Sequence, residues 1–286
     1  MRFFCHFSLP LHFGNQGNEY VLVFSYYKNT TLFPDYQIFI TAYFLIHHPI
    51  INSNLKLCFK NQIEKPVKRG AMRSLVGCEY FILKRKLHWL FGNEKFAKID
   101  KNIMPQVSII KHKSFLLRPL KDVDMALQYN KVENLKIAIQ CLNGVIIKPN
   151  EVFSVWKIVG RTTKRKGYKQ GLVLHNGQTS TGIGGELCQL GNLLYWIFLH
   201  SPLTIKERWR HGFDVFPDIN RKIPFACGAT LSYNYVDLQV KNDTNQTYKI
   251  NLWLDNEYLN GELFCSHELE CDYEIFETDH SIQHPW

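Results

Sequence analysis

The spacing of apolar and polar residues predicts a long amphipathic helix in the first half of the chain. Apolar residues recur at near-helical spacing across residues 73–91, at Leu75, Cys78, Ile82 and Trp89. Basic residues supply the polar side of this helix, at Arg73, Lys84, Arg85 and Lys86. Such a pattern usually marks a core-facing helix, so we expect it to pack on the main domain, with a membrane surface as the alternative.

A second helix and several short strands are predicted after it. Asn130 and Glu133 resemble a capping box, and apolar residues then repeat at helical spacing until Asn143-Gly144 ends the helix. These apolar residues are Val132, Leu135, Ile139 and Leu142. Residues 144–156 predict two strands around Pro149-Asn150, and residues 171–179 contain a turn signal at Asn176-Gly177.

The C-terminal third predicts an antiparallel meander. Between residues 229 and 240 the apolar residues change phase after Tyr235, which in a strand implies a bulge or a sheet corner. Residues 241–246 turn the chain, and a buried face follows at Tyr248, Ile250, Leu252 and Leu254. We therefore predict an α+β fold, in which a strongly bent antiparallel sheet carries a few packed helices.

The 286 residues divide into three predicted regions. Residues 1–65 are aromatic-rich and aperiodic, and we interpret them as a dispensable extension or an over-long start, with Met72 inside a plausible later beginning. Residues 66–129 form a helical N-terminal segment, and residues 130–286 form the main domain. No run of 18 apolar residues predicts a transmembrane helix, and the first residues make a poor signal peptide. We expect a cytoplasmic protein or one peripheral to the membrane.

The net charge of +9 is unevenly distributed along the chain. Residues 161–169 hold five basic residues and no acid, whereas residues 255–280 hold nine acids and no Lys or Arg. A basic stretch suits anionic envelope polymers or anionic lipid, although a solvated face is the commoner outcome. Because no nucleic-acid-binding motif accompanies it, we expect no nucleic acid as a partner.

The eight cysteines are scattered and include no CxxC pair, so we expect free thiols. Cys265, His267 and Cys271 fit no standard zinc spacing, and we expect neither a metal nor a cofactor.

The sharpest local feature is the stretch from residue 180 to residue 200. Gly182, Gly184 and Gly185 permit unusual backbone angles just before an apolar helix, whose buried stripe is predicted at Leu187, Leu190, Leu194 and Ile197. Cys188 falls in the first turn of this helix, on the face shared with Gly191, Asn192 and Tyr195. Unpaired amides at a helix start stabilise a thiolate, whereas a buried structural cysteine is the simpler interpretation.

A thiol nucleophile needs a base. His211, with Asp214 nearby in sequence, is our candidate for a base and its orienting carboxylate. Gly184, Gly185, Gln189 and Asn192 are the candidate substrate-binding residues.

Several blocks of this sequence resemble the VanW family. They are residues 130–160, GIGGELCQLGNLLYWIFLHSPLTIKER (182–208), RHGFDVFPD (210–218) and the GATLSYNYVDLQVKN run (228–242). The resemblance implies a link to glycopeptide resistance and to Gram-positive envelope biology, without an assigned reaction. The family motif resembles three glycines, one residue, then Cys-Gln. Here Glu186 stands in the third glycine position, which is unfavourable for Glu by about 1 kcal/mol if positive φ is needed there.

Three functions follow as hypotheses. The first is an accessory factor of peptidoglycan or glycopeptide-resistance physiology that acts by binding, with peptidoglycan fragments as partners. The second is a cysteine-dependent acyl-transfer or amide-bond enzyme that uses Cys188 and His211. The third is a basic module, around Lys164–Lys169, for an anionic envelope polymer or a membrane surface. Oligomeric state is left open.

Overall fold

The computed structural model describes residues 21–27, 70–117, 124–175, 178–209, 223–224, 227–233 and 236–277. Its helices are α3 (Ala71–Phe91), α4 (Met125–Leu142), α5 (Val155–Val159) and α6 (Cys188–Leu199), with a 3-10 turn, η1, at Lys164–Lys166. Its first nine strands are β1 (Val21–Tyr27), β2 (Lys95–Phe96), β3 (Lys98–Ile99), β4 (Val107–Phe115), β5 (Val145–Ile147), β6 (Glu151–Ser154), β7 (Gln170–His175), β8 (Gln178–Ile183) and β9 (Thr204–Glu207). The remaining strands are β10 (Gln239–Lys241), β11 (Tyr248–Leu254), β12 (Tyr258–Cys265) and β13 (Cys271–Glu277).

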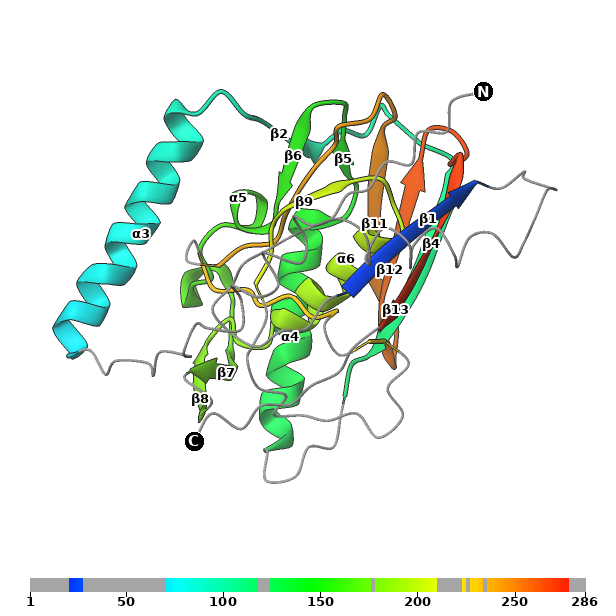
Figure 1. Ribbon diagram of the computed structural model, residues 1–286. Helices are drawn as coiled ribbons and strands as arrows, with labels where there is room; N and C mark the ends of the chain where they lie inside the picture. The colour runs from blue at the N-terminus through cyan, green and yellow to red at the C-terminus, as the bar shows by residue number, and fades with distance from the viewer. Residues whose placement is uncertain are drawn as a thin grey trace, which may run out of the picture.

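The strands form four sheets within the described residues, and the α+β class is confirmed. The largest sheet has the order β3-β5-β11-β12-β4 and is antiparallel throughout. A second sheet has the order β2-β6-β10-β9, with β2 and β6 parallel. The other two are the pairs β7–β8 and β1–β13. Figure 1 shows α4 and α6 at the centre of the molecule, with α3 standing to one side.

Helix α4 starts six residues earlier than the capping-box interpretation predicted, since its N-cap is Asp124 and not Asn130. Its N-cap is Asp124, whose side chain accepts a hydrogen bond from the Ala126 amide at 2.8 Å. The predicted end at Asn143-Gly144 is correct: the Asn143 side chain accepts from the Leu252 amide, and the Gly144 amide donates to Ile250. The helix is therefore tied at its end to strand β11.

The core lies between α4, α6 and the five-stranded sheet. All four residues of the predicted α6 stripe are buried: Leu187, Leu190, Leu194 and Ile197. Helix α6 crosses β12 where Gly261 leaves room, since a Cβ there would lie 2.6 Å from Leu193 Cδ2. On β11 the inward residues are Tyr248, Ile250 and Leu252, whereas Leu254 is only partly buried. Both strands predicted around Pro149-Asn150 are present as β5 and β6.

The single continuous strand predicted over residues 229–240 does not form. Among the described residues of this stretch, Ser232 and Val236 form an isolated antiparallel bridge, which is a reversal of the chain direction, and Gln239–Lys241 form β10, whose register shifts between Gln239 and Val240. The hairpin predicted near residues 171–179 is present as β7 and β8, while its turn at Asn176-Gly177 lies outside the described residues.

Asp237, which follows this reversal, is a buried carboxyl with several donors. Ser154 Oγ, the Gln239 side-chain amide and the amides of Trp156 and Leu238 all donate to it, at 2.6–3.2 Å. Burial raises the pKa of Asp237 to about 6, while these donors oppose the shift. The network joins β6 to β10 across the second sheet.

Helix α3 covers the predicted residues 73–91 and begins two residues earlier, at Ala71, but the side that faces the domain differs from the predicted one. Ile82 is buried as expected, whereas Leu75 and Cys78 are exposed. Arg85, predicted on the polar side, instead faces the domain and pairs with Glu207 through two contacts at 2.5 and 2.7 Å. No helix in the described part of the chain is long and apolar enough to cross a membrane.

Candidate functional site

The glycines before α6 allow two backbone segments to approach closely. A Cβ on Gly185 would lie 2.4 Å from the carbonyl of Gly171, on the neighbouring strand β7. Gly184 has φ +74°, and a Cβ there would lie 2.5 Å from Thr162. These two candidate substrate-binding residues therefore have a structural reason to be glycine: no side chain fits at either position.

Glu186, which replaces the third glycine, adopts φ +65°. The position therefore does have the positive φ that disfavours a side chain, as the sequence comparison with the family motif anticipated. The carboxylate is largely buried, accepts a hydrogen bond from the Gln128 side-chain amide at 3.0 Å, and lies 3.6 Å from Lys131 Nζ. Burial raises the pKa of Glu186, and the nearby Lys131 ammonium opposes that rise.

A buried polar row on α4 holds this motif in place, and the sequence analysis did not identify it. Its members are spaced three residues apart, at Gln128, Lys131 and Asn134. The Asn134 side chain donates to the carbonyls of Lys169 and Gly185 at 3.2 Å and accepts from the Lys169 amide at 2.8 Å. Polar residues at the spacing of the apolar stripe were the available signal, because helical periodicity places them on the buried face.

Cys188 is the first residue of α6, as predicted, and its thiol is bonded to the chain's own backbone. The Leu231 amide donates to Cys188 Sγ at 3.4 Å, and Sγ donates to the Leu231 carbonyl at 3.8 Å. The residue as a whole keeps partial exposure, but its thiol lies under the 227–231 segment.

The same segment covers the rest of this α6 face. The Asn192 side chain accepts a hydrogen bond from the Ala229 amide at 2.7 Å, and a Cβ on Gly191 would lie 2.8 Å from the Ala229 carbonyl. Tyr195 lies under the Arg208 guanidinium at 4.6 Å, and Arg208 Nε donates to the Gly228 carbonyl.

Gln189, on another side of the helix, donates from its side chain to Ser114 Oγ and to the Phe115 carbonyl. The predicted face around Cys188 is thus an internal contact surface within the described residues.

Electrostatics at Cys188 favour the neutral thiol. Burial raises the pKa of the Cys188 thiol, and the Glu186 carboxylate adds to the rise. The amides of Leu231 and of Cys188 itself oppose it, as expected for a helix start, but burial is the larger influence.

The candidate partners of Cys188, His211 and Asp214, lie outside the described residues. In the described part of the chain, Cys78, Cys141, Cys188 and Cys265 are free thiols. No group of three or more His, Cys, Asp or Glu side chains that could hold a metal occurs among the residues with described positions.

The geometry defines an α+β domain in which a glycine-rich hairpin leads directly into a helix that begins with a covered cysteine. Residues 130–264 match the family model described as VanW like protein. This part of the chain therefore belongs to the VanW family, as its motifs indicated.

Two relatives extend this assignment. The chain is 44% identical over 161 residues to the vancomycin B-type resistance protein VanW of Enterococcus faecalis, which covers 56% of this chain and 58% of that protein. It is 29% identical over 117 residues to the uncharacterized protein YoaR of Bacillus subtilis, covering 41% of this chain and 37% of YoaR. The chain thus spans less than two thirds of either relative, and no solved structure matches it.

Proposed function

We propose that this chain is a VanW-like accessory protein of peptidoglycan and glycopeptide-resistance physiology, and that it acts by binding. The family match and the name of the Enterococcus faecalis relative support the physiological setting. One observation supports binding over thiol chemistry: Cys188 Sγ is hydrogen-bonded to the Leu231 backbone under the 227–231 segment, where burial raises its pKa. A thiol in that setting is a weak nucleophile at neutral pH.

Calorimetric titration of the full chain tests the binding proposal. The ligands are soluble peptidoglycan fragments that end in D-Ala-D-Ala and, separately, vancomycin. We expect saturable binding of the peptidoglycan fragment, retained in a Cys188→Ala variant that has been checked for folding. Absence of binding to every fragment, or binding that disappears in a folded Cys188→Ala protein, contradicts the proposal.

The start of α6 favours a second candidate, a cysteine-dependent acyl-transfer or amide-bond enzyme acting on peptidoglycan-type substrates. Cys188 lies at the helix start, and the Leu231 amide donates to its sulfur, two features that stabilise a thiolate. In this candidate Cys188 is the nucleophile, His211 the base and Asp214 its orienting carboxylate. Gly184, Gly185, Gln189 and Asn192 would border the substrate.

Alkylation by iodoacetamide, read at each cysteine by mass spectrometry across pH, separates the two candidates. The accessory proposal expects Cys78, which is exposed, to react in the folded protein while Cys188 stays unmodified. The enzyme candidate expects Cys188 to react first, with a midpoint below about 8 that rises in His211→Ala.

A basic module for an anionic envelope polymer is a third candidate, which rests on Lys164 and Arg165. Both are exposed on the η1 turn, whereas Lys166 donates to the Val159 carbonyl and Arg161 pairs with Glu79. A Lys164→Ala/Arg165→Ala protein should bind a soluble poly(glycerol phosphate) more weakly, with a flatter dependence on salt. Unchanged binding across a salt series excludes this surface.

A further inference from the structure

Helix α3 is attached to the domain along one side. Ile82 is 8% exposed, and the ring of Trp89 meets that of Phe96 edge-on at 6.5 Å. Arg85 forms its two short contacts with Glu207, and Glu79 pairs with Arg161 at 3.0 Å. These contacts fix the orientation of the helix on the domain.

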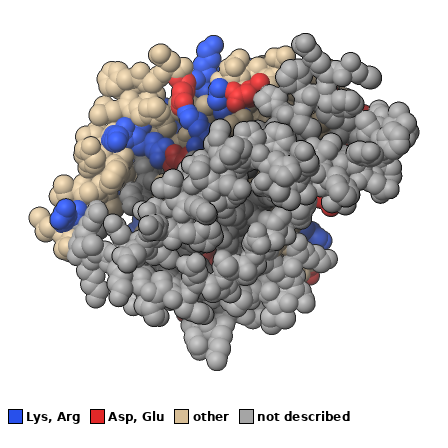
Figure 2. Space-filling view, viewed as in Figure 1, with Lys and Arg blue, Asp and Glu red and all other residues tan. Residues whose placement is uncertain are grey.

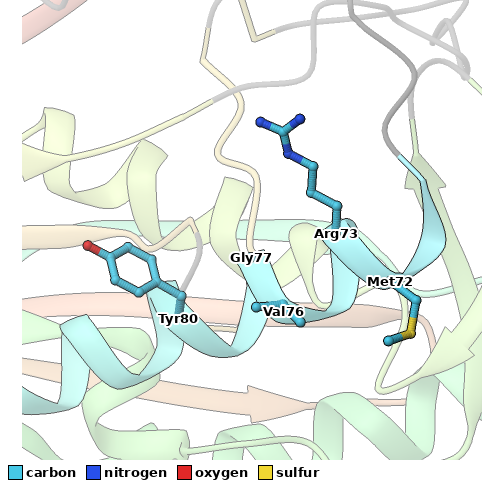
Figure 3. Close-up of a pocket in the computed structure, with 5 residues that line it drawn as sticks. All are labelled: Met72, Arg73, Val76, Gly77 and Tyr80. Carbon is cyan, nitrogen blue, oxygen red and sulfur yellow. The ribbon is translucent and has the colours of Figure 1, made fainter.

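The opposite side of α3 is an exposed apolar stripe. Met72, Leu90 and Phe91 are 77%, 73% and 76% exposed, and the stripe also contains Val76, Tyr80, Leu83 and Leu87. From Val76 onward the spacing is four, three, four and three residues, which keeps these side chains on one helical face. Figure 3 shows its N-terminal part, a shallow groove lined by Met72, Arg73, Val76, Gly77 and Tyr80 of the same helix.

Basic residues flank this stripe. Helical periodicity puts Arg73 and Lys84 along one edge and Lys86 along the other. All three are exposed, and none forms an ion pair with a residue that the structure describes. Glu79 is the one acid in the helix sequence, and Arg161 already neutralises it. On the face drawn in Figure 2, Lys and Arg side chains appear on the side where α3 lies, with a few Asp and Glu side chains beside them and uncharged surface around them.

A second copy of α3 packed against this stripe would bring like charges together. In a parallel pair, Arg73, at the edge of the stripe and three residues before Val76, would lie beside the Arg73 of its copy. In an antiparallel pair that aligns the apolar layers about Leu83, Lys84 would lie beside the Lys84 of its copy. Both arrangements bring like charges together, which destabilises the pairing.

We propose that α3 is an interfacial helix that docks this protein on a bilayer surface containing anionic phospholipid. The apolar stripe enters the boundary between headgroups and acyl chains, and Arg73, Lys84 and Lys86 extend to the lipid phosphates. A broad apolar stripe with cations on both edges is complementary to such a surface. This inference concerns a different face from the Cys188 region and does not depend on the proposed ligand.

The test uses the full chain and vesicles of phosphatidylglycerol with phosphatidylcholine, compared with vesicles of phosphatidylcholine alone, by co-sedimentation. We expect binding to the anionic vesicles that weakens about tenfold or more in Leu83→Glu/Leu90→Glu. The matched control, Met104→Glu/Tyr129→Glu, changes two exposed apolar residues elsewhere and should bind like the wild type. Lys84→Gln/Lys86→Gln should weaken binding by about tenfold or more, and Lys98→Gln/Lys101→Gln should not.

Three vesicle results would overturn the proposal: the full chain does not bind anionic vesicles, it binds phosphatidylcholine vesicles equally well, or a control pair weakens binding as much as the stripe pair. Light scattering on the unbound protein can give a fourth contradicting result. If the wild type is a dimer that Leu83→Glu/Leu90→Glu dissociates, the stripe belongs to a second copy. Circular dichroism of each variant confirms that a loss of binding is not a loss of fold.

Discussion

The thiol of Cys188 and the backbone of Leu231 are bonded in both directions, with the Leu231 amide donating at 3.4 Å and the thiol donating back at 3.8 Å. This reciprocal contact joins the start of α6 to the 227–231 segment. A buried thiol with these two hydrogen bonds contributes mainly to packing and to satisfying the backbone amide and carbonyl that it contacts.

Replacing Cys188 by Ala should therefore destabilise the fold. We expect a loss of about 1–2 kcal/mol in the free energy of unfolding, because the Leu231 amide loses its partner and a small void forms. Urea denaturation followed by circular dichroism measures it. Cys78→Ala, at an exposed position, is the control and should change stability by less than about 0.5 kcal/mol. Equal stability of Cys188→Ala and the wild type would contradict this role.

The positive φ at Glu186 predicts that a glycine variant is more stable than an alanine variant there, the reverse of the usual order within a helix. Both Glu186→Gly and Glu186→Ala lose the contacts with Gln128 and Lys131, so the difference between them isolates the backbone cost. We expect the glycine variant to be more stable than the alanine variant by about 1 kcal/mol, since only glycine adopts φ +65° without strain.

The same pair of substitutions at Lys136 provides the control. Lys136 lies exposed within α4, where alanine should be more stable than glycine by up to about 1 kcal/mol. Chemical denaturation of the four variants measures both differences. If alanine is more stable than glycine at position 186 as well as at position 136, the backbone at Glu186 is not strained.

The buried carboxyl of Asp237 predicts a pH dependence of stability. Its pKa is raised to about 6 in the folded protein, so its contribution to stability is greatest at low pH and is lost as pH rises from about 4 to about 6. Relative to Asp237→Asn, which cannot ionise, the wild type should lose about 2 kcal/mol between pH 4.5 and pH 7.

Asp255 provides a control in which stability should change with pH in the opposite direction. Hydrogen bonds from the Glu257 amide and the Asn260 side chain lower the pKa of Asp255, so its contribution grows as pH rises. Urea titrations of wild type and Asp237→Asn between pH 4.5 and pH 7 give the first slope, and titrations of wild type and Asp255→Asn below about pH 4, where Asp255 becomes protonated, give the second. A wild-type curve parallel to that of Asp237→Asn would mean that Asp237 titrates normally.

Residues 1–65 should be dispensable for the fold of the rest. In the described part of the chain, the core begins at Ala97, and β1 forms a two-stranded sheet with β13. Removing residues 1–65 therefore takes away one strand of that small sheet and no member of that core. Residues 66–286 should retain the urea midpoint of the full chain, with circular dichroism to compare secondary structure. A large fall in midpoint or solubility would show that the first region is integral.

The sequence by itself determined the local elements where a single periodicity was uninterrupted. The apolar stripe of α6, the strand β11 and the end of α4 at Asn143 follow from it, because each element buries one regular face. The blocks that resemble the VanW family lie within the residues that match the family model, and the family motif pointed to position 186, where φ is positive.

Only the tertiary structure decided what each polar or reactive group contacts. Gln128, Lys131 and Asn134 are buried because the hairpin of β7 and β8 returns against α4, a contact between segments that lie dozens of residues apart. Cys188 is covered because the 227–231 segment packs on α6, and Arg85 faces inward because Glu207 lies across from it. Periodicity reports which face of an element is apolar, whereas the partner of that face depends on long-range packing, which local spacing does not encode.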